Sequence, residues 1–397
     1  MREVVMNVPF LDLKAQYKTL KHEIDKRILD VVESQKFILG SEVAELEKKV
    51  ASYTRTKYGI GISSGSDALI VSLMALGIGK EDAVVTTPFT FFATVGAIVR
   101  VGARVIFCDI DKKTYNMNPE SLEDVIKVEI KKKLVSKVKA IIPVHLYGQC
   151  ADMAPILGSA EKYKLSVVED AAQAIGAEYP SPSGVQNACG MGDLGILSFF
   201  PSKNLGAYGD GGMILTDNEK LAEKVRILRV HGAQNKYFHD IIGGNFRLDS
   251  IQAAVLLVKL KYLDDWSQKR KNNALLYDRL FKETGLTANG ILQIPDAVYK
   301  PSGIPRYHIY NQYVIRVKNR DGLQKYLTSK GIATAIYYPL ALHLQECFAY
   351  LGYKQGDFPE TEKATAEVLA LPIYPELGTD QQEYIVASIK EFYEIGN

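Results

Sequence analysis

The chain has 397 residues, of which 47% are hydrophobic, and its formal net charge is only +2. A chain of this length can bury one large core and a smaller one. The near-neutral charge excludes a protein that binds nucleic acid through overall basicity. The four cysteines are far apart and form no CxxC pair, so we expect free thiols in a reducing compartment. The six histidines show no HExxH or similar spacing, which argues against a metal site.

The N-terminus lacks the features of an export signal. Glu3 and Asp12 lie within its first dozen residues, and no long apolar run follows them. The longest strongly apolar stretch, Ala68 to Gly77, is too short to span a bilayer. We therefore expect a cytoplasmic protein with no membrane partner.

The first two thirds of the chain predict an α/β domain. An amphipathic helix is predicted over residues 14–35, and Gly40 with Ser41 then starts a second helix over 42–52. Short apolar segments next alternate with helical patterns, and we expect strands near 58–62, 83–87, 104–108, 138–143, 165–169, 195–200 and 212–216. This alternation predicts a mostly parallel seven-stranded sheet flanked by helices. Ligands of such sheets bind at the carboxyl ends of the strands, beside helix N-termini.

The last third predicts a smaller α+β domain. One long amphipathic helix over Leu248–Trp266 is expected to lead out of the large domain. A strand at 311–317, a helix at 320–330 and two helices near the end follow. We therefore divide the chain into an N-terminal arm and large domain, 1–265, and a small domain, 266–397.

The first motif with chemical meaning is SSGSDAL, Ser63 to Leu69, which follows a strand and opens an apolar helix. Small residues let backbone N–H groups close around an anion, and the helix N-terminus adds a partial positive charge. The motif is either a phosphate cup or an ordinary turn with a serine N-cap.

A carboxylate and a lysine end two later strands. Asp170, in VVEDAAQAIGA, can hold a protonated ring nitrogen or can cap the next helix. Gln173, three residues on, can donate to a phenolic ring oxygen. Lys203 follows SFFPS and precedes a glycine-rich turn, where backbone and cofactor can approach closely. Neutral lysine attacks aldehydes, so burial would activate Lys203, and Ser198 lies close enough in sequence to reach a phosphate.

The segment TTPFTFFAT, Thr86 to Thr94, supplies aromatic rings. One ring can stack on a cofactor, whereas at least two of Phe89, Phe91 and Phe92 fit ordinary core positions. Phosphate cup, aromatic ring, carboxylate and lysine therefore occur in this order, each at a strand end. Together they are the contacts that pyridoxal 5'-phosphate (PLP) requires.

These motifs resemble those of the DegT/DnrJ-type sugar-nucleotide aminotransferases, which have PLP fold type I, the aspartate-aminotransferase fold. The similarity begins at PFLDLKAQY, Pro9 to Tyr17, and continues through SSGSDAL, TPFTFFAT, PVHLYGQCADM, EDAAQAIGA and SFFPSKNLGAYGDGG. It extends to GGNFRLDSIQAA, Gly243 to Ala254, and resumes more weakly at YYPLALHLQ, Tyr337 to Gln345. It thus covers nearly the whole chain.

The resemblance implies a role for each motif residue. Lys203 would be the Schiff-base lysine and would carry the proton between substrate and cofactor carbons. Asp170 would pair with the pyridinium, Gln173 with the ring oxygen, and Phe91 would stack on the ring. The phosphate would be held by small residues of two motifs: Ser64, Gly65, Ser66 and Ser198. Ser66 is a mild departure from the family pattern, which usually has threonine at this position. Serine keeps the hydroxyl group of that threonine.

The resemblance also implies a homodimer with shared active sites. In this family a segment of the partner reaches into the site, and Asn245 and Arg247 lie in that segment of this chain. Each chain would then complete the cofactor site of the other.

The implied reaction has two halves. L-glutamate gives its amino group to the cofactor, leaving pyridoxamine phosphate, and a keto-sugar nucleotide then accepts that group. PVHLYGQC and FFPSKNLGAYGDGG most resemble members that aminate a C3 keto carbon of dTDP-linked deoxysugars or UDP-linked N-acetyl sugars. Such enzymes serve amino-sugar biosynthesis for lipopolysaccharide or other glycans. Amination at C4 is the alternative. His308 and His343 are candidates for the sugar-nucleotide pocket, or else are structural histidines.

Three rival functions remain for comparison. Related sugar dehydratases carry histidine where Lys203 stands. A nucleotide-binding oxidoreductase is suggested by Gly59-x-Gly61, but Ser64 occupies the place of the third glycine. A non-catalytic sensor is disfavoured by the intact lysine and aspartate. Two insertions, near 125–138 and 179–190, depart from the family pattern, and the second either shapes the sugar pocket or is a surface loop.

Overall fold

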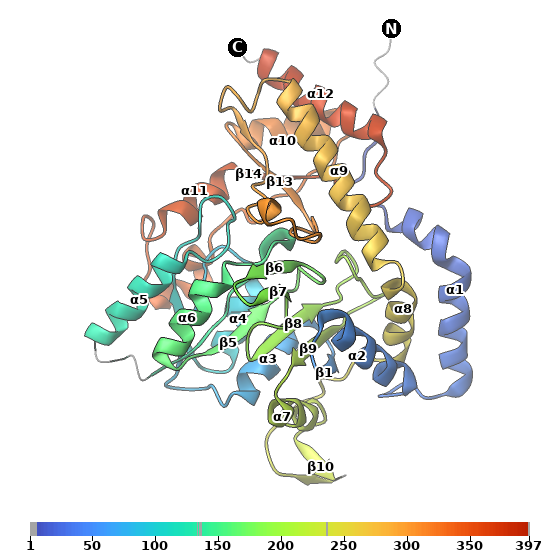
Figure 1. The fold of residues 1–397 in the computed structure, drawn as a ribbon, viewed down its shortest axis with the longest axis vertical. Helices are drawn as coiled ribbons and strands as arrows, with labels where there is room; N and C mark the ends of the chain where they lie inside the picture. Colours follow the sequence, from blue (N-terminus) through green and yellow to red (C-terminus); the bar gives the residue numbers. More distant parts are fainter. Residues whose placement is uncertain (1–5, 133, 135–136, 236, 396–397) are drawn as a thin grey trace.

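A seven-stranded sheet forms the centre of the computed structural model, which describes residues 6–132, 134, 137–235 and 237–395 (Figure 1). The strand order is β1-β9-β8-β5-β4-β2-β3. These strands are β1 (Tyr58–Ile62), β2 (Ala83–Thr86), β3 (Arg104–Phe107), β4 (Val138–Ile141), β5 (Ser166–Asp170), β8 (Leu194–Ser198) and β9 (Gly212–Thr216). Within the described residues six strands run parallel, and β9 is antiparallel to its neighbours β1 and β8. The predicted mostly parallel sheet is therefore confirmed.

Helices cover both faces of this sheet because its strands are apolar on both sides. Adjacent residues of β2 show the alternation, since Val84 and Val85 belong to two different buried clusters. The first face packs against α2 (Ser41–Thr54), α5 (Pro119–Lys131), α6 (Met153–Tyr163) and α8 (Ser250–Leu260). The second face packs against α3 (Gly65–Ala75), α4 (Phe92–Arg100) and α7 (Glu219–Arg229). Helix α1 (Leu13–Ser34) lies outside this layer, against α8.

The prediction of one long helix over 248–266 is wrong. Helix α8 ends at Leu260, and after a turn the chain continues as α9 (Leu263–Glu283). The turn residues Lys261 and Tyr262 both bind the carboxylate of Glu23 on α1, and the Tyr262 ring stacks on Trp266. No glycine or proline marks this break in the sequence. The break is accompanied by tertiary contacts with α1, which the sequence does not reveal.

The C-terminal part has its own three-stranded antiparallel sheet, ordered β12 (Leu292–Gln293), β13 (Tyr313–Val317) and β14 (Val368–Leu371). Helices α9, α10 (Arg320–Ser329), α11 (Pro359–Glu367) and α12 (Thr379–Ile395) accompany it. Tyr277, Tyr313 and Leu323 are among the buried residues of a separate core. Val8 pairs with Ile332, so the N-terminal residues cross onto this part. The domain boundary at 265/266 stays a prediction, and α9 runs through it.

The remaining elements are short. They are two hairpins, β6 (Glu178–Ser181) with β7 (Gly184–Asn187) and β10 (Ala233–Asn235) with β11 (Phe238–His239), and 3-10 turns at Leu146–Gly148, Lys300–Ser302, Leu342–Leu344 and Glu346–Leu351. The insertion near 179–190 is the first of these hairpins, and its tip is exposed at Gly184 and Val185. The insertion near 125–138 begins inside α5, while residues 133 and 135–136 lie outside the described part.

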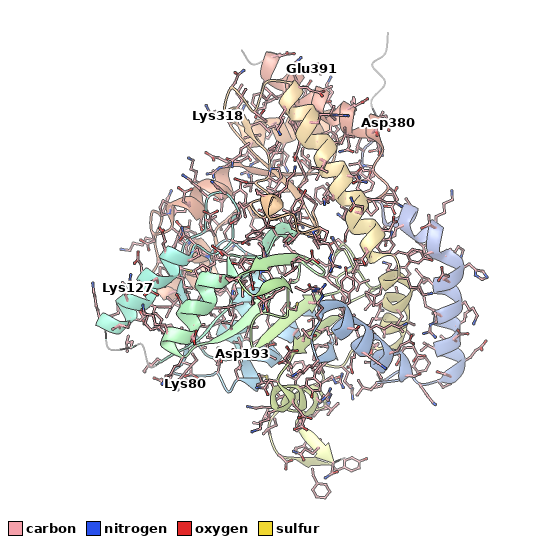
Figure 2. The ribbon with its side chains drawn as sticks, in the orientation of Figure 1. Lys80, Lys127, Asp193, Lys318, Asp380 and Glu391 are labelled. Carbon is pink, nitrogen blue, oxygen red and sulfur yellow. The ribbon has the colours of Figure 1, made fainter. Side chains whose placement is uncertain are left out.

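Charged side chains such as Lys80, Lys127 and Glu391 lie at the edge of the molecule (Figure 2). Cys108, Cys150, Cys189 and Cys347 are unpaired thiols, as expected. In the part of the chain that the structure describes, we find no helix with the length and apolarity needed to cross a bilayer.

Candidate active site

The predicted site residues meet at the carboxyl ends of the parallel strands. The Ser63–Ser66 turn follows β1, Phe91 follows β2, Asp170 ends β5, and Ser198 ends β8. Parallel strands bring their carboxyl ends to one edge of the sheet, which is why residues this far apart in sequence converge. Lys203 follows β8 and lies close enough to Asp170 for their charges to interact.

The candidate phosphate cup is formed by close packing of small residues. Ser64 caps α3 by accepting a hydrogen bond from the Asp67 N–H at 3.0 Å, and Gly65 and Ser66 occupy the first helical positions. The amides of a first helical turn have no partner within the helix, so they can bind an anion. A Cβ atom added to Gly65 would lie 2.6 Å from Ser198 Cβ. The cup and Ser198 therefore touch, and a larger residue at Gly65 would separate them.

Asp170 is a buried carboxylate with two hydrogen bonds. The Thr94 hydroxyl donates to Oδ2 at 2.8 Å, and the Ala172 N–H donates to Oδ1 at 3.2 Å. Burial raises the pKa of this carboxyl, whereas these hydrogen bonds and the nearby Lys203 and His145 lower it. A buried anion is stabilised by a cation at contact distance, which a protonated ring nitrogen supplies.

Lys203 has an activated amine. Loss of solvent around it lowers the pKa of the amine to about 8, although the negative charge of Asp170 opposes this shift. Its backbone N–H donates to the Phe200 carbonyl at 2.8 Å. The next side chain, Asn204, donates to the Ile309 carbonyl at 3.3 Å and so joins this turn to the C-terminal part.

The three phenylalanines after β2 occupy different environments. Phe89 is fully buried, and the Phe92 ring stacks on Phe348 with centroids 5.2 Å apart. Phe91 is 58% exposed, and its ring centroid lies 6.3 Å from that of Tyr338. Phe91 is therefore the most exposed of the three and the one best placed to contact a ligand, while Phe89 packs against Tyr115 and Phe92 against Phe348.

Gln173 is held in a fixed orientation beside Asp170. Its Oε1 accepts from the Tyr147 N–H at 2.7 Å, and its Nε2 donates to the Tyr338 hydroxyl at 3.1 Å. The amide has a second hydrogen, which leaves it one bond for a ligand oxygen. Tyr338 was missed from the sequence, although it lies in the YYPLALHLQ segment.

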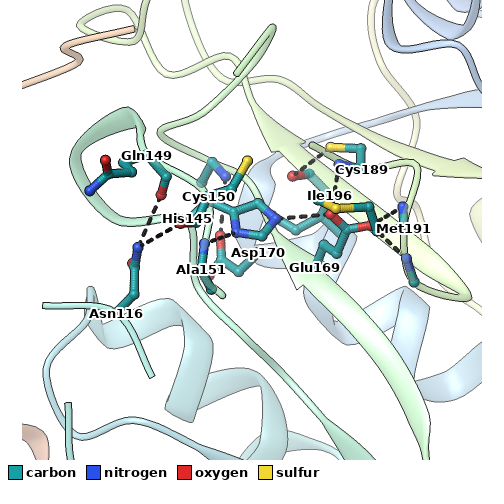
Figure 3. A network of polar contacts seen from close by, with 12 residues as sticks. Asn116, His145, Gln149, Cys150, Ala151, Glu169, Asp170, Cys189, Met191 and Ile196 are labelled. Carbon is teal, nitrogen blue, oxygen red and sulfur yellow. Dashed lines mark hydrogen bonds and ion pairs between the residues drawn. The ribbon is translucent and has the colours of Figure 1, made fainter. Parts of the chain in front are cut away.

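A buried polar network next to Asp170 was also missed (Figure 3). The side chains of Glu169 and His145 are fully buried and lie 2.8 Å apart, Oε2 to Nε2. The Glu169 carboxylate also accepts backbone N–H bonds at 2.9, 2.6 and 2.7 Å, from Cys189, Met191 and Gly192. The backbone N–H of His145 donates to the backbone carbonyl of Asp170 at 2.9 Å, so the network fixes the end of β5. The signal in the sequence was an ionisable residue inside the apolar run VVED, which requires a buried partner.

Asn245 and Arg247 flank Phe246, whose backbone carbonyl accepts from the N–H of Ser63, in the turn after β1, at 3.0 Å. Asn245 is exposed and pairs with Val230 after the β10–β11 hairpin. Arg247 is partly buried and pairs with Ile62, where β1 ends. The structure contains one chain, so their predicted contact with a partner's site stays a prediction.

The two candidate substrate histidines have packed rings. His308 stacks on Tyr310 with centroids 4.0 Å apart and accepts the Tyr310 N–H at Nδ1, and burial lowers its pKa to about 3. His343 is 1% exposed and its Nε2 lies 3.1 Å from Glu362 Oε1. These positions favour the alternative that both are structural histidines.

The family model of the DegT/DnrJ/EryC1/StrS aminotransferases matches residues 18–390. The chain belongs to this family. A "Pleiotropic regulatory protein" of Geobacillus stearothermophilus is 50% identical over 392 residues, covering 98% of this chain and 99% of the relative. The "UDP-2-acetamido-2-deoxy-3-oxo-D-glucuronate aminotransferase" of Pseudomonas aeruginosa is 38% identical and covers 96% and 99%. A UDP-N-acetyl-3-dehydro-alpha-D-glucosamine 3-aminotransferase of Acidithiobacillus ferrooxidans is 40% identical and covers 96% and 97%.

Solved structures of the same kind superpose closely. A DegT DnrJ EryC1 StrS aminotransferase from Brucella abortus has a TM-score of 0.89 at 37% identity, covering 97% of this chain and 99% of that one. NtdA from Bacillus subtilis, solved with bound cofactor PMP, has a TM-score of 0.87 at 31% identity, covering 99% and 86%. The fold of this family member is therefore that of the PLP aminotransferases, as predicted.

The residues of the site fit the cofactor of the family, PLP. The cup of small residues suits a phosphate, the buried Asp170 suits a ring cation, and the amine of Lys203 has the lowered pKa that reaction with an aldehyde needs. The family member is thus a PLP-dependent transferase.

Proposed function

We propose that the protein transfers the amino group of L-glutamate to a keto-sugar nucleotide, with a C3 keto carbon as its preferred acceptor. The observation that carries this proposal is the buried carboxylate of Asp170 at the sheet edge, near the amine of Lys203, whose pKa is lowered by loss of solvent. Support for the acceptor comes from two relatives, whose names describe amination of 3-oxo UDP-sugars. A dTDP-linked deoxysugar and a C4 keto carbon are the alternatives.

Each residue of the site would have a distinct task. Lys203 would bind PLP covalently and, once released by the donor, would move a proton from the donor's α-carbon. Bound PLP supplies an electron sink that stabilises negative charge on that carbon. Asp170 would keep the ring nitrogen protonated, and Gln173 would donate its free amide hydrogen to the ring oxygen. Phe91 would cover one ring face, and the phosphate would be held by Ser64, Gly65, Ser66 and Ser198.

We also infer a homodimer in which Asn245 and Arg247 serve the partner's site. The short segment before Asn245 carries the side chains of Phe238, in β11, and Ile242, just after it, which are 73% and 89% exposed. Exposed apolar side chains next to each other are typical of a protein interface. The free thiols fit a reducing compartment, which supports a place in the cytoplasm.

A regulatory protein is the second candidate, because the name of the Geobacillus relative describes one. A sensor needs to bind PLP but does not need to turn over an amino donor. The two functions therefore differ in one measurable step, the reaction with L-glutamate.

The decisive experiment follows the absorbance of the PLP-loaded protein. L-glutamate is expected to convert the bound cofactor and release one 2-oxoglutarate per site, and borohydride should attach the cofactor to the peptide that contains Lys203. Protein that binds PLP but leaves glutamate unchanged would favour the regulatory candidate. Protein that takes up no PLP would contradict both. UDP- and dTDP-linked 3-keto and 4-keto sugars, tested separately with NMR of the product, then identify the acceptor.

A further inference from the structure

Lys259, on α8, is an unusual residue for a protein interior. It is 2% exposed, and its ammonium group donates to the Gly206 carbonyl at 2.7 Å. The ammonium also lies 4.7 Å from the centre of the Tyr208 ring. Among the residues that the structure describes, no carboxylate forms an ion pair with Lys259. Burial of a lysine ammonium is strongly unfavourable unless hydrogen bonds or an opposite charge compensate it. The contact of Lys259 with Gly206 therefore needs an explanation.

Gly206 belongs to the turn that carries Lys203. A Cβ atom added to Gly206 would lie 2.3 Å from the Pro201 carbonyl oxygen, so the two ends of this short segment are packed tightly. The Ala207 N–H donates to the Phe199 carbonyl at 2.8 Å, which closes the turn. A displacement of the Gly206 carbonyl would therefore also move the backbone of Lys203.

A second side chain of α8 holds the same turn. Gln252 lies seven residues before Lys259, two helical turns away and on the same face. Its Oε1 accepts from the Tyr208 N–H at 2.8 Å. Helix α8 thus holds the turn at two points: Gln252 accepts from the Tyr208 N–H, and Lys259 donates to the Gly206 carbonyl, two residues earlier.

We propose that Lys259 and Gln252 are positioning residues, which together clamp the turn that carries Lys203 to helix α8. This inference rests on the proposed role of Lys203 in binding PLP covalently. The clamp holds the Lys203 amine over the cofactor site while taking no part in binding the phosphate or the ring. Its loss should therefore slow the covalent step without weakening non-covalent binding.

The test compares two cofactor forms on the full-length protein freed of cofactor. PLP reports the covalent step, whereas pyridoxamine phosphate occupies the same cup and has no aldehyde for Lys203 to attack. In Lys259→Met, which keeps an unbranched apolar stem and removes the donor, covalent capture of PLP should slow about tenfold, since a misplacement of about 1 Å can cost up to about 100-fold. The dissociation constant of pyridoxamine phosphate should change less than about twofold, which is about 0.4 kcal/mol, because the proposed clamp does not contact the phosphate or the ring. Amide exchange should rise in the peptide covering residues 200–211.

Lys261→Met is the matched control, because Lys261 lies just beyond the same helix, its side chain is 58% exposed, and it binds Glu23 instead. It should leave capture and amide exchange unchanged. Equal loss of affinity for both cofactor forms in Lys259→Met, or wild-type capture, would overturn the clamp. If Lys259→Met does not fold, Gln252→Ala decides by the same two measurements. If the wild-type protein and Lys261→Met capture no PLP at Lys203, the proposed function fails, and not the clamp alone.

Discussion

The reactivity of Lys203 gives a prediction that can be worked out quantitatively. An ordinary lysine amine has a pKa of 10.5, and the pKa of Lys203 is lowered to about 8 by burial. At pH 7.5 roughly one amine in four is then neutral, compared with about one in a thousand for an unperturbed lysine, which is a difference of about 200-fold. Since the neutral amine is the nucleophile, the rate of PLP capture should rise with pH to a midpoint near 8.

Asp170→Asn tests how far the charge of Asp170 opposes the lowering of the Lys203 pKa. The carboxylate of Asp170 raises the pKa of Lys203, so its removal should lower the midpoint below that of the wild type. Asparagine keeps the shape of the side chain and one oxygen, which can accept one of the two hydrogen bonds that Asp170 accepts from Thr94 and Ala172. Stopped-flow absorbance of cofactor-free protein mixed with PLP, across a range of pH, gives both midpoints. Lys203→Ala provides the blank, because it should show no covalent capture at any pH.

Two results would refute this reasoning. A wild-type midpoint near the ordinary lysine pKa would mean that the amine is not desolvated before the cofactor binds. A higher midpoint in Asp170→Asn would mean that another group controls Lys203. Lys259 has a pKa lowered to about 8 as well, but it faces the Gly206 carbonyl, so the shift in Asp170→Asn distinguishes the two lysines.

Three further variants and one control test the phosphate cup, the buried network beside Asp170 and the buried histidine His308. Gly65→Ala should lower the free energy of unfolding by about 1–3 kcal/mol and weaken binding of pyridoxamine phosphate, because the new Cβ overlaps Ser198; in Gly158→Ala, a helical control with open space, the free energy of unfolding should rise by about 0.5–1 kcal/mol. Glu169→Gln should lower the urea-derived free energy of unfolding by about 3 kcal/mol, since a buried carboxylate with four donors is lost. His308 has a folded pKa of about 3 against an ordinary 6.5, so it stays neutral when folded and stability is lost as pH falls below 6.5. His308→Gln should reduce this loss by up to about 1.4 kcal/mol per pH unit.

Contrary outcomes are equally specific. Unchanged cofactor affinity in Gly65→Ala would place the phosphate elsewhere. An unchanged free energy of unfolding in Glu169→Gln would mean that the network in Figure 3 does not hold β5. An identical acid profile in wild type and His308→Gln would mean that the His308 ring gains protons as easily when folded as when unfolded.

The sequence by itself determined the sheet and the motifs at its edge. The strands are apolar on both faces and helical patterns lie between most of them, so the strand positions and a mostly parallel sheet follow from local composition. Asp170 and Ser198 could be named for the same reason, because each ends a strand and strand ends converge, and Lys203 could be named because it stands in the turn that follows β8.

Only the tertiary structure decided which neighbours each residue has. The break between α8 and α9 accompanies contacts of Lys261 and Tyr262 with Glu23 on a distant helix, and no local residue type marks it. Phe91 could not be separated from Phe89 and Phe92 until their packing was known. The same holds for Lys259, which has the composition of an ordinary helix lysine but is buried against the turn of Lys203. Burial and long-range contacts are properties of the assembled fold, and they decide which of these side chains is available for chemistry.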